Sequence, residues 1–143
     1  MSFFELTGLY FDRSNALQWY WTLYVLIIGG LLAFSALRSR PDLITTLLVS
    51  ILFASFAYKN MGAIVETTLQ RLAILDTMTQ LADGGAAEVN AVSDRLLPTL
   101  KPVLPDPIRR FHIMCDVLTI GAIWAMELRR RRKFGADVVV TMK

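Results

Sequence analysis

The sequence contains one cysteine and one histidine, and charged residues make up only 19% of its 143 residues. A single cysteine excludes a disulfide within the chain and a cysteine-based metal cluster held by one chain. A glycine-rich phosphate loop, an HExxH sequence and paired carboxylates within one apolar run are also missing. Because the sequence lacks these common catalytic arrangements, we predict that the protein is not an enzyme.

Apolar residues are plentiful, at 55% of the chain with a mean hydropathy of +0.48. They are concentrated in three runs, at about residues 16–37, 43–65 and 111–128. A helix of about 20 residues crosses the hydrocarbon core of a bilayer, which is about 30 Å thick. We therefore predict an all-α integral membrane protein with three transmembrane helices, forming a single membrane domain over residues 1–143.

The ends of these runs predict how the chain is oriented. Aromatic residues begin the first run, and cations follow the first and third runs: Trp19, Trp21, Arg38, Arg40, Arg129, Arg130, Arg131, Arg132 and Lys133. Tryptophan prefers the membrane interface, and cations are retained on the cytoplasmic side. We predict a multi-pass protein of a bacterial inner membrane or an equivalent membrane, with its N-terminus outside and its C-terminus cytoplasmic. Retention of cations on the cytoplasmic side also accounts for the net charge of +3. The positive charge therefore does not indicate nucleic-acid binding, and we expect no nucleic-acid partner.

The segment between the second and third runs, residues 66–107, is predicted to be an outer amphipathic helical segment. Its apolar residues recur every three or four positions from Val65 to Ala82, which is the helical period. We expect the second helix to continue to about Leu81 and to stop at Asp83-Gly84-Gly85. A second short helix is expected at about residues 86–97. The prolines that follow predict an extended connector over residues 100–107.

The two ends of the chain are predicted to be short appendages. Residues 1–15 are amphipathic, and two placements fit them equally: on the membrane surface, or packed on neighbouring helices. Residues 129–143 form a basic cytoplasmic tail that is too short to be a domain. Glu127, beside the arginine run, is expected to be solvated or salt-bridged to it.

Two ionisable residues, Lys59 and Asp116, fall within predicted spans, where charges are costly and often functional. Helix rise places both in the outer leaflet at similar depth. One hypothesis is that they form an intramembrane ion pair, within one chain or between chains. The alternative is that Lys59 extends alone to the interface, while Asp116 bonds to Arg109, Arg110 or backbone.

His112 is a weak candidate for cofactor binding, because it lies four residues before Asp116 on the same helical face. Such a pair could relay protons, or orient the imidazole as a ligand of a haem or chlorophyll type of cofactor or a metal. The alternative is an interfacial histidine without a ligand, and we predict no cofactor and no metal. Cys115 is interpreted as a small packing residue.

Small residues within the first two spans predict packing seams between helices. The first seam is Gly29 and Ala33, and the second is Ser50, Ala54 and Ala57. Small side chains let membrane helices approach closely, so we interpret both as packing surfaces rather than as the lining of a pore.

Three functions fit these features. The leading hypothesis is a small non-enzymatic accessory subunit, which packs against other subunits in the lipid bilayer and stabilises a larger membrane complex through protein–protein interaction. The alternative is a homo-oligomeric ion channel or pore, with copies of the chain as partners and Lys59 or Asp116 on a shared axis. The third is a haem- or pigment-binding subunit that uses His112.

Overall fold

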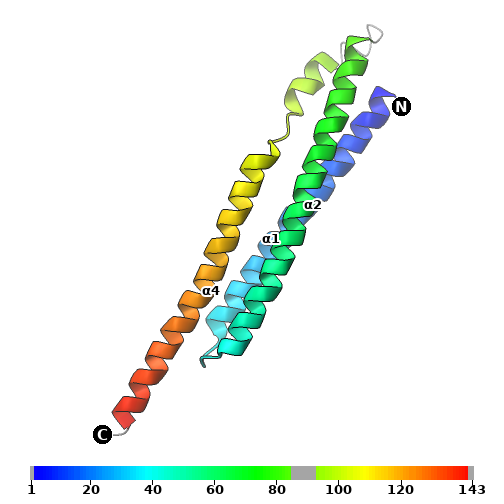
Figure 1. Ribbon diagram of the computed structural model, residues 1–143. Helices are drawn as coiled ribbons and strands as arrows, with labels where there is room; N and C mark the ends of the chain where they lie inside the picture. Colours follow the sequence, from blue (N-terminus) through cyan, green and yellow to red (C-terminus); the bar gives the residue numbers. More distant parts are fainter. Residues whose placement is uncertain (1, 85–92, 142–143) are drawn as a thin grey trace. The chain divides into compact units, whose positions relative to one another are not determined.

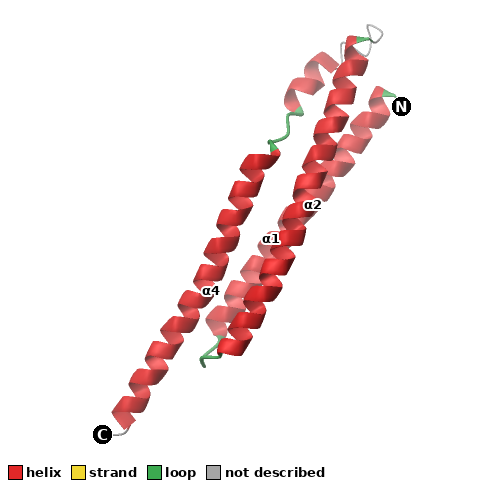
Figure 2. Cartoon of the chain, in the orientation of Figure 1, coloured by secondary structure: helices red, strands yellow, loops and turns green. Residues whose placement is uncertain are grey.

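The computed structural model describes residues 2–84 and 93–141, with side chains described as far as Phe134. Three long helices and one short 3-10 helix follow in order: α1 (Phe3–Leu37), α2 (Leu43–Asp83), η1 (Leu97–Thr99) and α4 (Pro105–Thr141) (Figure 1). The described part of the chain is 90% helical and contains no strand (Figure 2). The prediction of an all-α fold is confirmed.

Each long helix contains a segment that is long and apolar enough to cross a membrane. Three such helices are compatible with a multi-pass membrane protein. The second helix continues without a break to Asp83, as the apolar period predicted. The first begins at Phe3 rather than near Ala16, so the N-terminal segment belongs to the same helix as the first apolar run.

The region before the third run differs from the prediction. The extended connector expected at residues 100–107 ends before Pro105, where α4 begins. Pro105 and Pro107 lie in the first turn, where a helix needs no backbone N–H donors, so proline is tolerated there. Most of the short helix expected at residues 86–97 lies outside the described residues, of which 93–96 are helical.

At its far end, α4 continues as a helix through the arginine run to Thr141. Arginine and lysine are good helix formers, so cations that cannot enter lipid do not have to end the helix. The predicted tail at residues 129–143 is therefore largely helical.

The chain divides into two compact units. Unit 1 comprises Met1–Thr22 and Met61–Arg110, and unit 2 comprises Leu23–Asn60 and Phe111–Lys143. The core of unit 1 is apolar and consists of Phe3, Leu6, Tyr10, Ile74, Met78 and Leu100. The N-terminal segment thus packs on α2, which favours the second of its two predicted placements.

Hydrogen bonds and a cation–π contact of Tyr10 and Arg71 stabilise this core. The Tyr10 hydroxyl donates a hydrogen bond to the Leu100 carbonyl and accepts one of 2.7 Å from Arg71 Nη2. The Arg71 guanidinium also lies 4.7 Å from the centre of the Tyr10 ring, a cation–π contact. These bonds join α1, α2 and the segment after η1 within unit 1.

In unit 2 the buried positions follow steps of three and four residues. On α2 they are Thr46, Ser50, Phe53, Ala57 and Asn60. This heptad spacing is typical of helices that pack side by side along their length. Many of the buried side chains are polar, whereas most of the exposed large side chains of unit 2 are aliphatic or aromatic.

The short link before α2 is ordered by Asp42. Its carboxylate accepts hydrogen bonds from the Thr45 N–H (3.1 Å) and the Thr45 hydroxyl (2.6 Å), an N-cap that satisfies the first turn of α2. These hydrogen bonds from Thr45, helped by the charge of Arg38, hold the pKa of Asp42 below its usual value.

Candidate functional site

The first polar cluster of unit 2, the histidine cluster, consists of Tyr24, Asn60, His112 and Asp116. Tyr24 comes from α1, Asn60 from α2, and the other two from α4. His112 is fully buried, and the side chain of Asp116 is 19% exposed. Each residue lies on the face of its helix that packs against the other two helices, so the packing of the three helices brings these polar groups together.

Asp116 is the acceptor at the centre of this cluster. Its Oδ2 lies 2.9 Å from His112 Nδ1, and its Oδ1 accepts a hydrogen bond of 2.6 Å from the Tyr24 hydroxyl. The Tyr24 ring also lies against the imidazole, with 4.1 Å between ring centres. The carboxylate therefore fixes both a phenol and an imidazole.

Both ring nitrogens of His112 have partners. With Asp116 as acceptor, the proton is assigned to Nδ1, and Nε2 then accepts from the Asn60 amide nitrogen at 3.4 Å. Axial binding of a haem or chlorophyll through Nε2 would have to displace Asn60. The helical spacing correctly predicted the contact between His112 and Asp116, but not the contacts with Tyr24 and Asn60.

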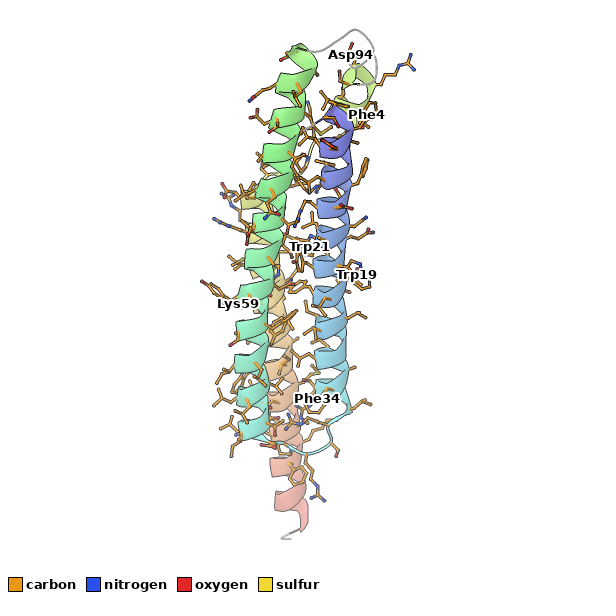
Figure 3. The ribbon with its side chains drawn as sticks, turned by 90° about the vertical axis from the view of Figure 1, so that its right-hand side faces the viewer. Phe4, Trp19, Trp21, Phe34, Lys59 and Asp94 are labelled. Atoms are coloured by element: carbon orange, nitrogen blue, oxygen red, sulfur yellow. The ribbon has the colours of Figure 1, made fainter. Side chains whose placement is uncertain are left out.

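Lys59 is not a partner of Asp116 within the chain. Its side chain is exposed, and Figure 3 shows it pointing outward from α2. Among the described residues, the hydrogen-bond partners of the Asp116 side chain are Tyr24 and His112. These are not the partners that the alternative predicted, which were Arg109, Arg110 or backbone. Pairing of Lys59 and Asp116 between chains stays a prediction.

The second polar cluster, the glutamate cluster, is centred on Glu127 of α4, which is fully buried. Arg131 Nε lies 3.0 Å from Oε1, and Arg130 Nη2 lies 3.2 Å from Oε2. On the opposite side, Thr46 Oγ1 of α2 lies 3.2 Å and Arg38 Nη2 lies 3.9 Å from Oε2. One carboxylate thus joins three cations.

Arg38 and Arg130 also bond to groups outside the carboxylate. Arg38 donates to the Thr46 hydroxyl and to the Asp42 carbonyl, both at 3.0 Å. Arg130 Nη1 donates to the Ser35 carbonyl at 2.5 Å, which satisfies an acceptor in the last turn of α1. These two arginines, expected only to anchor the topology, also connect α1, α2 and α4 within unit 2.

The burial of Glu127 was not predicted from the sequence. Its position beside the arginine run predicted either a solvated carboxylate or one that forms salt bridges with the arginines. The available signal was spacing: Glu127 lies four residues after Ile123, which is itself buried eleven residues after His112. That period places Glu127 on the buried face of α4 rather than on its outer face.

The predicted packing seams have different outcomes. Ser50 and Ala57 are buried, and Trp124 Nε1 donates a hydrogen bond of 3.1 Å to the Ser50 hydroxyl. Ala54 is exposed. It lies four residues after Ser50, which places it about 40° further around the axis of α2, on the side away from Phe53. Gly29 and Ala33 are both exposed, and a Cβ atom added to Gly29 would meet no described atom within 4 Å.

The remaining anchors lie on the outside. Trp19 is 72% exposed and Trp21 is half-buried; both are labelled in Figure 3. Arg40, Arg129, Arg132 and Lys133 are exposed. Among the described residues, no group of three histidine, cysteine or acidic side chains is placed to hold a metal ion. Comparisons with protein-family models, curated proteins and solved structures find no match for this chain.

Proposed function

We propose that the chain is a small integral subunit that packs against other subunits of a membrane complex, with unit 2 in the bilayer. The distribution of polarity in unit 2 supports the membrane placement. Its interior contains His112, Glu127, Asn60 and several hydroxyls, whereas its surface carries side chains such as Leu26, Leu52 and Val117, each more than 60% exposed. A surface of this kind is favourable in lipid and costly in water.

The observation that carries the role of a subunit is a second face on α1. Tyr24 and Ser35 on the first face are buried in unit 2. The second face presents Gly29, Gly30 and Ala33 between the exposed Leu26 and Leu37.

A Cβ atom added to Gly29 or Gly30 would meet no described atom within 4 Å. The two glycines therefore form a notch on the surface of α1 that no described part of unit 2 fills. Lipid chains need no such notch, whereas the backbone of another membrane helix fits one closely. We infer that a helix of another subunit occupies this face.

The polar groups of unit 2 support a structural role over a catalytic one. Asp116 is held by Tyr24 of α1 and His112 of α4, and Glu127 is held by Thr46 of α2 and the arginines of α4. Such bonds hold the helices in a fixed arrangement and so preform the outer faces for assembly. The proposal also includes an orientation in the membrane. If the basic end of the spans lies in the cytoplasm, the N-terminus is outside and the C-terminus is cytoplasmic.

The test is to extract the chain from native membranes in mild detergent and identify what is recovered with it by mass spectrometry. We expect foreign membrane subunits in a fixed ratio, and we expect Gly29→Leu and Gly30→Leu to release them. Gly62→Leu on α2 is the matched control, since a Cβ there also meets nothing within 4 Å and no small residue lies one helical turn away. Recovery of copies of this chain alone would refute the proposal and direct attention to the homo-oligomeric channel.

A further inference from the structure

A pocket of about 360 Å³ lies in unit 2 where α1 ends, and its lining is strongly cationic. Four cations line it, one from the link after α1 and three from α4: Arg38, Arg129, Arg130 and Lys133. The other lining residues are uncharged: Ala36, Ser39 and Met126. None of the lining residues in the described part of the chain is acidic. Cations gathered around one cavity repel each other, and an anionic ligand would relieve that repulsion.

Two of these cations are already held in place. Arg38 is fixed by Thr46 and the Asp42 carbonyl, and Arg130 by Ser35 and Glu127. A ligand that binds them loses little side-chain entropy, because the guanidinium groups are oriented before it arrives. Both side chains are only slightly exposed, at 14% for Arg38 and 11% for Arg130.

The charge that remains after internal pairing is positive. Glu127 is shared among Arg38, Arg130 and Arg131, and the exposed Asp42 lies 3.9 Å from Arg38. Arg130 Nε is buried and has no hydrogen-bond partner among the described residues. A buried donor of this kind gains a bond when an anionic oxygen enters.

The neighbourhood of the pocket is apolar as well as basic. Ala36 and Met126 form part of its lining, and Leu37 and Leu128 beside them are 86% and 53% exposed. A ligand with a phosphate group and acyl chains satisfies both features at once. Basic pockets between membrane helices on the cytoplasmic side suit such headgroups.

We propose that this pocket binds the phosphate of an anionic phospholipid headgroup. This inference depends on the proposed membrane placement of unit 2 and not on the identity of any partner subunit. Arg38 and Arg130 contact the phosphate from positions set by the glutamate cluster. Arg129 and Lys133, one helical turn apart on α4, add charge from the exposed side.

The experiment measures lipid binding to the full chain by native mass spectrometry, in detergent, after removal of endogenous lipid. The probes are phosphatidylglycerol, phosphatidylcholine and inorganic phosphate. The variant is the double substitution Arg129→Gln and Lys133→Gln, which leaves the glutamate cluster intact. The control is Arg40→Gln and Arg132→Gln, which removes the same charge from exposed residues that do not line the pocket.

We expect one phosphatidylglycerol to be retained over phosphatidylcholine, and the pocket variant to bind it about 30-fold more weakly, from roughly fivefold per cation near an anionic surface. The control should change binding by less than about threefold. An equal loss in both variants, or no preference for phosphatidylglycerol, would overturn the proposal. So would displacement of the lipid by inorganic phosphate, which would identify a soluble phosphate as the ligand.

The same samples separate this inference from the proposed function. Membrane insertion of each variant is measured by resistance to alkaline extraction, and partner subunits are counted in the native extract. Lipid binding that persists without partners would contradict only the role of a subunit. Insertion and partner binding without lipid selectivity would contradict only the phosphate pocket.

Discussion

Replacement of Glu127 by alanine is the sharpest test of the interior of unit 2, because this side chain is fully buried among cations. Its carboxylate lies 3.0 Å from Arg131 and 3.2 Å from Arg130. At an effective dielectric constant of about 20, the contact with Arg130 contributes roughly 5 kcal/mol of Coulomb attraction. The contact with Arg131 contributes less, because solvent screens a side chain that is 44% exposed. Desolvation of the ions offsets most of this attraction.

After the substitution, Arg38 and Arg130 keep their desolvation cost without their anion. Removal of one partner from a buried ion pair costs about 3–5 kcal/mol, which is the expected loss in the free energy of unfolding. Glu127→Gln keeps the shape and the contact with the Thr46 hydroxyl. It should therefore lose less, about 1.5–3 kcal/mol, which is the usual strength of hydrogen bonds to charged groups.

The assay is the free energy of unfolding of the purified chain in bicelles, measured by steric trapping. The control is Glu66→Ala on α2, which removes an exposed carboxylate and should change stability by less than about 0.5 kcal/mol. If Glu127→Ala costs no more than this control, Glu127 is not buried among the arginines and the glutamate cluster does not form. A loss in the glutamine variant equal to that in the alanine variant would refute the contribution of shape and Thr46.

Three further predictions concern the other bonded groups. Tyr10→Phe removes the hydroxyl that joins Leu100 and Arg71, and it should destabilise unit 1 by roughly 1–3 kcal/mol. The loss should appear as faster amide exchange at Ile74, and unchanged exchange would contradict the prediction. Asp116→Ala should lower the free energy of unfolding by several kcal/mol and change the ¹⁵N shift of His112 Nδ1, whose proton it accepts; an unchanged shift would exclude that assignment. Asp42→Ala should weaken the start of α2 at neutral pH. Because its folded-state pKa is lowered, the difference from the parent is complete above the unfolded pKa of about 3.9 and disappears as pH falls through the folded pKa; circular dichroism that shows the same difference at pH 2 would contradict it.

The contacts of unit 2 also explain why two residues of the same type have different roles. Arg38 and Arg40 both follow the first apolar run, yet only Arg38 is half-buried and bonded to α2 and α4. Arg40, two residues further along this non-helical link, is exposed. Substitution of Arg40 should consequently affect orientation in the membrane, whereas substitution of Arg38 should affect stability.

The sequence by itself determined the helical class and the three apolar runs. These are properties of consecutive residues: an uncharged run such as residues 16–37 has one favourable backbone form in lipid, because a helix satisfies its own hydrogen bonds. The continuation of α2 to Asp83 was predictable for the same reason, since its apolar period extends without a proline up to two adjacent glycines. The start of α4 was not, because proline permits both an extended connector and the first turn of a helix.

Only the tertiary structure decided which polar groups meet. His112 and Asp116 were related by spacing within one helix, but Tyr24 and Asn60 joined them from helices that are distant in sequence. Ala54 was expected on one packing seam with Ser50 and Ala57 but is exposed, since the rotation of α2 about its axis depends on the neighbouring helices. The same rotation on α4 buried Glu127 and assembled the cationic pocket. Linear pattern sets the length and period of each helix, whereas packing selects the faces that come into contact.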